Sequence, residues 1–184
     1  MGFKTEDDRS SVTAIFPDHA GAGKAIKELK NCGLDIEKLS VVGRDSHTED
    51  HAAGFYTRGE RIRYGGKRDF LGDECWGDLA GAAFLIIPGV GPVIVAGPVA
   101  NWIIGALEGS IFIGGMSALG AGLVTLGIPR RTVFKYEIAI KAGKLVLMTL
   151  GTEEDARRAR RILEITEAEE INTNEMPPEP ARVA

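Results

Sequence analysis

The residues of this chain that are best suited to binding a metal ion lie in a short polar stretch. The run His47-Thr48-Glu49-Asp50-His51 places two imidazoles four positions apart, with two carboxylates between them. On a helix these imidazoles would share one face and could hold a divalent cation. No third or fourth ligand stands at a recognisable spacing, and the flanking residues have the composition of a loop. We therefore expect a solvated acidic loop and no bound metal, with His47 and His51 as the candidate ligands.

A second stretch could in principle hold a phosphate group. The run DHAGAG at 18–23 follows a β-rich segment and opens a helical one, which is the usual place of a phosphate-binding loop. Its glycines have neither the GxGxxG nor the Walker spacing, and no Lys-Ser or Lys-Thr follows. The carboxylate of Asp18 can instead accept backbone N–H groups at the start of the helix. We therefore expect a capped helix and not a nucleotide site.

One adjacent pair, Tyr136 and Glu137, is the remaining functional candidate. The structural alternative is that Tyr136 packs against a sheet and its hydroxyl finds a partner there. No Ser-His-Asp set, carboxylate pair or nucleotide motif is recognisable, so we expect no enzyme activity, no catalytic residue and no cofactor. The formal net charge of −4 also argues against nucleic acid as a partner.

These residues are arranged around one long uncharged stretch. Residues 79–107 contain no Asp, Glu, Lys, Arg or His, and residues 109–129 are again uncharged after Glu108. Small residues recur every four positions, a spacing that lets apolar helices approach closely in lipid. We predict an apolar helical hairpin over 76–127, with Trp102 at an interface. The glycines expected to form its helix contacts are Gly97, Gly105, Gly109, Gly114 and Gly122.

Basic residues on both sides of this stretch bear on its location. Such residues stay on the cytoplasmic side of a membrane, which requires an even number of passes or a re-entrant hairpin. A spanning helix needs about 20 apolar residues, and 81–107 is long enough if its prolines only kink it. The alternative is a soluble homo-oligomer whose copies bury the hairpin against each other. The sequence leaves two locations open: the cytoplasmic face of the inner membrane, and the cytoplasm.

Ordinary α/β patterns flank the apolar stretch. Residues 11–16 and 39–43 have strand composition and are separated by a helical pattern, so they should form a βαβ unit with parallel strands. After the stretch, a helix starting at Pro129 precedes a strand at 144–150 and a helix capped by Thr152. A final strand over 167–171 has poor β composition, and the chain looks disordered beyond it.

The run GIP at 127–129, the YE pair at 136–137 and the run GKLVL at 143–147 resemble a known pattern. Together with the glycine-proline insert, they are similar to bacterial general-stress and low-temperature-induced proteins of unknown function. The resemblance covers roughly 11–163. It implies a small ferredoxin-like domain split by a glycine-zipper insert, and stress-linked, membrane-associated behaviour. It implies no known enzyme activity and supplies no catalytic residues.

We therefore predict an α+β fold, in which a small ferredoxin-like βαβ…αβα domain is split by an apolar glycine-rich helical hairpin. The predicted function is non-enzymatic and stress-associated, with anchoring to a membrane or self-assembly through the hairpin. The alternative is a ligand- or metal-sensing α/β module with the same hairpin as its anchor. The predicted parts are a flexible N-terminus at 1–10, the split domain at 11–43 and 128–171, a polar connector at 44–75, the hairpin at 76–127 and a disordered tail at 172–184.

Overall fold

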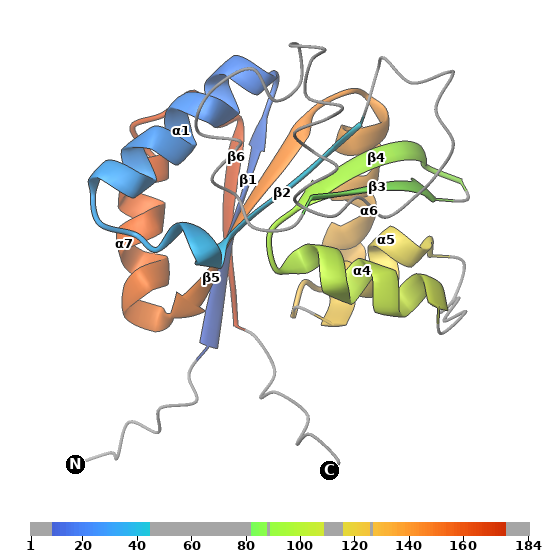
Figure 1. The fold of residues 1–184 in the computed structure, drawn as a ribbon. Helices are drawn as coiled ribbons and strands as arrows, with labels where there is room; N and C mark the ends of the chain where they lie inside the picture. The colour runs from blue at the N-terminus through green and yellow to red at the C-terminus, as the bar shows by residue number, and fades with distance from the viewer. Residues whose placement is uncertain (1–8, 45–81, 88, 109–115, 126, 176–184) are drawn as a thin grey trace, which may run out of the picture.

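A computed structural model of the chain describes residues 9–44, 82–87, 89–108, 116–125 and 127–175. They form one antiparallel sheet of six strands with helices on both faces (Figure 1). The main elements are β1 (Arg9–Phe16), α1 (His19–Asn31), β2 (Leu39–Arg44), β3 (Ala82–Ile87), β4 (Gly91–Ala96), α4 (Val99–Glu108), α5 (Ala118–Thr125), α6 (Arg130–Lys141), β5 (Leu145–Thr152), α7 (Glu153–Leu163) and β6 (Glu170–Glu175).

The strand order is β3-β4-β2-β5-β1-β6. Strands β1 and β2 are parallel to each other, as predicted, but β5 lies between them and is antiparallel to both. A second βαβ unit, β5-α7-β6, interleaves with the first one. The prediction of a small α+β domain is confirmed. The sheet is wider than the four-stranded sheet of the predicted ferredoxin-like domain, because β3 and β4 extend it beyond β2.

Helices α1 and α7 cover one face of the sheet. The residues predicted to cap their first turns, Asp18 and Thr152, do so. The Asp18 Oδ1 atom accepts a hydrogen bond of 2.8 Å from the Gly21 N–H at the start of α1. Thr152 and Asp155 form a reciprocal capping box at the start of α7. Apolar side chains from β1, β5 and both helices fill the layer between, including Phe16, Ile26, Leu29, Leu147, Ala159 and Leu163.

Asp155 connects this layer to the chain before β2. Its Oδ2 atom accepts a hydrogen bond of 3.0 Å from Lys38 Nζ, and this bond holds the pKa of the carboxyl below its ordinary value of 3.8. The lowered pKa means that Asp155 stabilises the fold at neutral pH. That stabilisation is lost as the pH falls below about 4, through the pKa of the folded state.

We expect Asp155→Ala to lower the free energy of unfolding by about 1–2 kcal/mol at pH 7, because a cap and an ion pair are removed. At pH 3 the difference from the unchanged protein should be clearly smaller, since protonation weakens the same contacts. Urea unfolding at the two pH values measures both differences. An equal difference at pH 7 and pH 3 would contradict the assigned role.

The predicted helical hairpin at 76–127 is correct for only part of the described range: α4 and α5 are helices that pack against each other, but the residues before them form strands. Residues Ala82–Ile87 and Gly91–Ala96 are paired antiparallel strands, and only afterwards do the short helices α4 and α5 follow. Runs rich in β-branched side chains favour the extended backbone here. Gly89 and Gly91 close the turn with φ angles of +82° and +99°, which glycine adopts at little cost.

The described part of the apolar stretch packs largely against the second face of the chain's own sheet. Helices α4 and α5 lie beside α6 there (Figure 1), and the strands of the stretch extend the sheet beneath them. The fully buried side chains of this layer include Ile87, Val93, Val95, Val99, Ile103, Leu119 and Leu123. The premise that these residues need a lipid or a second copy as dry surroundings is therefore wrong for the described residues. Within the described ranges, no helix has the length and apolarity to cross a membrane.

The end of the described chain also differs from the prediction. Residues 172–175 belong to strand β6, which pairs antiparallel with β1, and not to a disordered tail. The open edge of β1 provides the backbone partners, so this polar segment becomes a strand despite its poor β composition. The N-terminus before Arg9, the connector after Arg44 and the segment 176–184 lie outside the described residues.

Candidate functional site

Helix α6 separates the buried second layer from solvent. It follows Gly127, whose φ is +84°, and Pro129, whose fixed φ suits the start of a helix. Its buried side chains are Val133, Tyr136, Glu137, Ala139 and Ile140. All remaining positions except the half-buried Thr132 are exposed.

Tyr136 points into the sheet and is fully buried. Its hydroxyl lies 2.5 Å from Thr13 Oγ1 on β1 and accepts a hydrogen bond of 3.2 Å from Asn172 Nδ2 on β6. This is the arrangement expected from the structural alternative for Tyr136. The side chain connects α6 to two strands, and its hydroxyl is already hydrogen-bonded to both of them.

Glu137 points elsewhere, toward α5, and only 6% of it is exposed. The Ser117 hydroxyl donates a hydrogen bond to Glu137 Oε1 and accepts one of 3.2 Å from the Gly120 N–H. A Cβ atom at Gly120 would lie 2.6 Å from Glu137 Oε1 and 2.9 Å from Val133 Cγ1. Tyr136 therefore connects α6 to β1 and β6, and Glu137 connects α6 to the start of α5. The two side chains point to different places and do not form a joint site.

Sequence reasoning missed Ser117 and Gly120 as the partners of Glu137. The available signal was a serine directly before a helical run, which is a common N-cap residue. A glycine three positions later allows the neighbouring helix to approach.

The glycines predicted to form a zipper have different roles. Gly122 lets α4 approach α5 within the same chain, since a Cβ atom there would lie 2.9 Å from Ile103 Cγ1. Gly97 has a φ of +91° and forms a tight turn, in which a Cβ atom would lie 2.1 Å from the Leu39 carbonyl oxygen. Gly105 is exposed, and a Cβ atom there would meet nothing within 4 Å. Gly109 and Gly114 lie outside the described residues.

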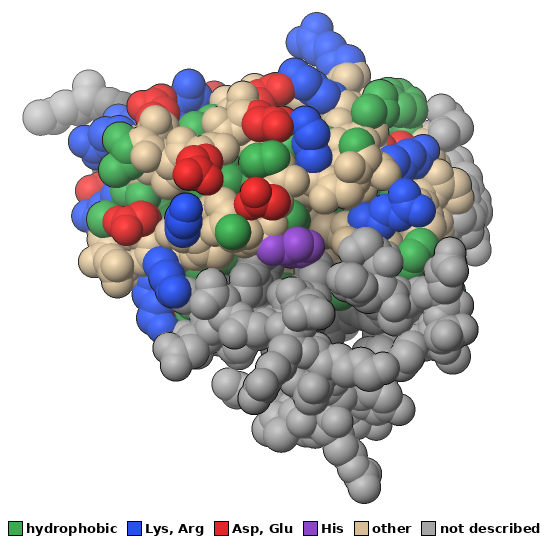
Figure 2. Space-filling view, turned by 90° about the horizontal axis from the view of Figure 1, so that it is seen from above, with side chains coloured by type: hydrophobic (Ala, Val, Ile, Leu, Met, Phe, Trp, Pro, Cys, Tyr) green, Lys and Arg blue, Asp and Glu red, His purple; other side chains and the backbone are tan. Residues whose placement is uncertain are grey.

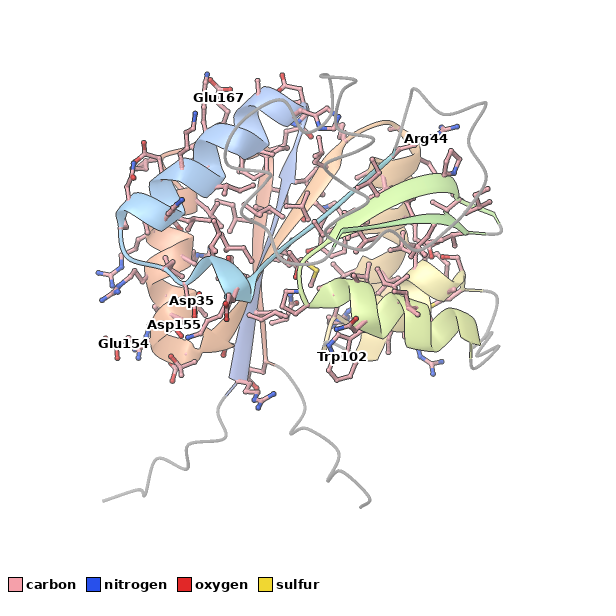
Figure 3. The ribbon with its side chains drawn as sticks, in the orientation of Figure 1. Asp35, Arg44, Trp102, Glu154, Asp155 and Glu167 are labelled. Carbon is pink, nitrogen blue, oxygen red and sulfur yellow. The ribbon has the colours of Figure 1, made fainter. Side chains whose placement is uncertain are left out.

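Trp102 lies on α4 and is half-buried against the apolar layer between the sheet and helices α4, α5 and α6 (Figure 3). It therefore contacts its own chain. The candidate metal ligands His47 and His51 are outside the described residues. Among the residues that the structure does describe, no group of three or more His, Cys, Asp or Glu side chains could hold a metal ion.

The exposed surface of α6 combines apolar and cationic side chains in an ordered way. Phe134 is 45% exposed and Ile138 is 66% exposed, and they are adjacent on the helix because they are four positions apart. Helical spacing places cations on both sides of this apolar centre. The single acid of α6, Glu137, is buried. We call this surface the α6 face: Arg130, Arg131, Phe134, Lys135, Ile138 and Lys141.

Two contacts connect the α6 face to its surroundings. Lys135 forms an ion pair with Glu170 of β6. The Arg44 guanidinium donates a hydrogen bond of 3.0 Å to the Lys141 carbonyl oxygen, which adds a further cation at the end of α6. Arg130 and Arg131 have no ion-pair partner among the described residues. Viewed from above, acidic and basic side chains are mixed over the half with α1 and α7, whereas few acidic side chains are seen on the opposite half (Figure 2).

Glu170 is held from two sides. Lys135 and, to a smaller extent, Asn172 keep the pKa of its carboxyl below the ordinary value of 4.5. The Asn172 contact is a hydrogen bond of 2.8 Å from Nδ2 to Glu170 Oε1. Because Asn172 also donates to Tyr136, the carboxylate of Glu170 is part of a fixed polar network at the margin of the α6 face.

Sequence reasoning used the cations of α6 only as flanks of a membrane hairpin. It missed Phe134 and Ile138 as exposed residues, because the buried pair Tyr136 and Ile140 has the same spacing of four. A search against family models, curated proteins and solved structures finds no match to this chain. The resemblance to general-stress proteins therefore stays a prediction from the residues quoted for it.

Proposed function

We propose that the protein is a non-enzymatic module that attaches to an anionic membrane surface through the α6 face. The observation that carries the proposal is the pair Phe134 and Ile138, exposed at the centre of a helix surface that has four cations and no acid. The sequence predicted either attachment to a membrane or self-assembly, and the proposal keeps the first of these. The element proposed for it is now a peripheral helix and not a spanning hairpin.

The chemistry of the α6 face suits a lipid surface. Helices that lie in the membrane interface insert an apolar side and place Lys and Arg among the head groups. Each cation near an anionic surface contributes about 1 kcal/mol. Arg130, Arg131 and Lys141 carry no ion-pair partner among the described residues, so together they would contribute about 3 kcal/mol. Insertion of the two apolar side chains adds to this, and the resulting attachment is reversible.

Self-association through the same surface is less favoured. A two-fold contact places a surface against its own copy. Two α6 faces would then bring four cations against four cations, and among the described residues only Lys135 has an acid partner, Glu170. An anionic lipid surface supplies the missing charge, and a convex helix surface fits a bilayer better than it fits a groove.

The test is flotation of the full-length protein with vesicles. We expect binding to vesicles of 30% phosphatidylglycerol in phosphatidylcholine, and much weaker binding to phosphatidylcholine alone. Binding should decrease in 0.5 M NaCl, because salt screens exposed charges. Absence of binding to the anionic vesicles, or equal binding to both kinds, would overturn the proposal.

A further inference from the structure

We propose that Glu170 competes with anionic lipid for the ammonium group of Lys135, and so weakens attachment to the membrane. In the free protein the ammonium group of Lys135 contacts the Glu170 carboxylate, and on the membrane it exchanges this carboxylate for a lipid phosphate. The inference rests on the proposed function, because it concerns how attachment through the α6 face is restrained.

The geometry makes one partner of this pair fixed and the other free to move. Glu170 Oε2 contacts Lys135 Nζ, and Glu170 Oε1 accepts the hydrogen bond from Asn172. Asn172 is itself tied to the buried Tyr136 hydroxyl. Lys135, by contrast, is an exposed residue on a flexible four-carbon stem. The lysine can therefore turn away from β6 while the carboxylate stays in place.

The competing interactions have similar strength. An exposed ion pair contributes roughly 0.2–1 kcal/mol, and a lysine beside an anionic surface contributes about 1 kcal/mol. The free energy that Lys135 contributes to membrane binding is therefore reduced by the free energy needed to break its ion pair with Glu170. Glu170→Gln removes the competing charge, while its amide oxygen can still accept the hydrogen bond from Asn172.

Glu167 offers a matched control in the same segment. It forms an ion pair of 3.7 Å with Lys24 of α1, and α1 lies on the opposite face of the sheet from α6. Figure 3 shows Glu167 beside α1. Glu167→Gln removes the same charge from a lysine ion pair without releasing a cation on the α6 face.

The experiment measures partitioning of full-length variants onto vesicles with 30% phosphatidylglycerol. We expect Glu170→Gln to bind about 2- to 5-fold more tightly than the unchanged protein. Glu167→Gln should differ from the unchanged protein by less than about 1.5-fold. Adding Lys135→Gln to Glu170→Gln should remove the gain, because the released lysine is then missing.

Two results would overturn the inference. One is an equal gain in Glu167→Gln and Glu170→Gln, which would show an effect of net charge alone. The other is a gain that persists when Lys135 is replaced. Failure of the proposed function is a separate outcome, since neither the unchanged protein nor Glu170→Gln would then bind. If the unchanged protein binds and Glu170→Gln binds equally well, only the competition is disproved.

Discussion

Replacing Gly97 by alanine should lower the free energy of unfolding by about 3 kcal/mol or more. The new Cβ atom would lie 2.1 Å from the Leu39 carbonyl oxygen and 2.8 Å from Ser40 Cα. Both are backbone atoms of the region around β2 and cannot rotate away. The φ of +91° adds strain for any residue that carries a side chain. Urea unfolding of the full-length protein measures the loss.

Gly105 provides the matched control. It lies inside α4, and a Cβ atom there would meet nothing within 4 Å. Alanine at this position should leave the stability unchanged or raise it by up to about 1 kcal/mol, because alanine favours the helix. A zipper between helices would instead make Gly105 a sensitive position. A destabilised Gly105→Ala variant, or a Gly97→Ala variant as stable as the unchanged protein, would contradict the described packing.

The second large effect concerns the α6 face. Changing Phe134 and Ile138 together to glutamate should weaken binding to anionic vesicles by about 30-fold or more, because two apolar anchors become two repelled charges. Both side chains are exposed, so the free energy of unfolding should change by less than about 1 kcal/mol. Vesicle flotation and urea unfolding of the same variant separate the two quantities.

Ile165 allows the effect of net charge to be separated from that of the face. It is 81% exposed and follows α7, and α7 lies on the opposite side of the sheet from α6. Ile165→Glu therefore makes the same chemical change as Ile138→Glu at a distant place. We expect the Ile138 variant to lose binding and the Ile165 variant to retain it. Similar losses in the two variants would show that the α6 face is not the attachment surface.

Apart from strand β6, the main elements outside the apolar stretch could be predicted because each carries a local signal. Asp18 and the pair Thr152 and Asp155 are helix caps that depend only on neighbouring residues. The near-continuous apolar run before Thr152 is typical of a central strand, and β5 does lie between β1 and β2.

The apolar stretch could not be assigned in the same way. Strand and helix are distinguished by the period of polar and apolar residues, and β4 has no polar side chain on either face. Without that contrast, glycine spacing suggested helices, although the β-branched composition of β3 and β4 favoured strands. The prediction for residues 172–175 was wrong for the opposite reason. This segment is polar, and it forms a strand because it pairs with the edge of β1.

The candidate site was predictable only in part. The cations of α6 are visible in the sequence, but the direction of its apolar residues is not. Tyr136 and Ile140 are buried, whereas Phe134 and Ile138 are exposed, and all four have apolar side chains at helical spacing. Which pair faces the sheet depends on tertiary packing, including the contact of Tyr136 with Thr13.

The central claim is that helices α4 and α5 pack inside the chain while α6 contacts the membrane. Quenching of tryptophan fluorescence by lipids with brominated acyl chains tests it most directly. One variant keeps Trp102 alone by Trp76→Phe, and another carries Phe134→Trp with both native tryptophans changed to phenylalanine. On anionic vesicles we expect strong quenching at position 134 and none at Trp102. Quenching of Trp102 without quenching at position 134 would contradict the account.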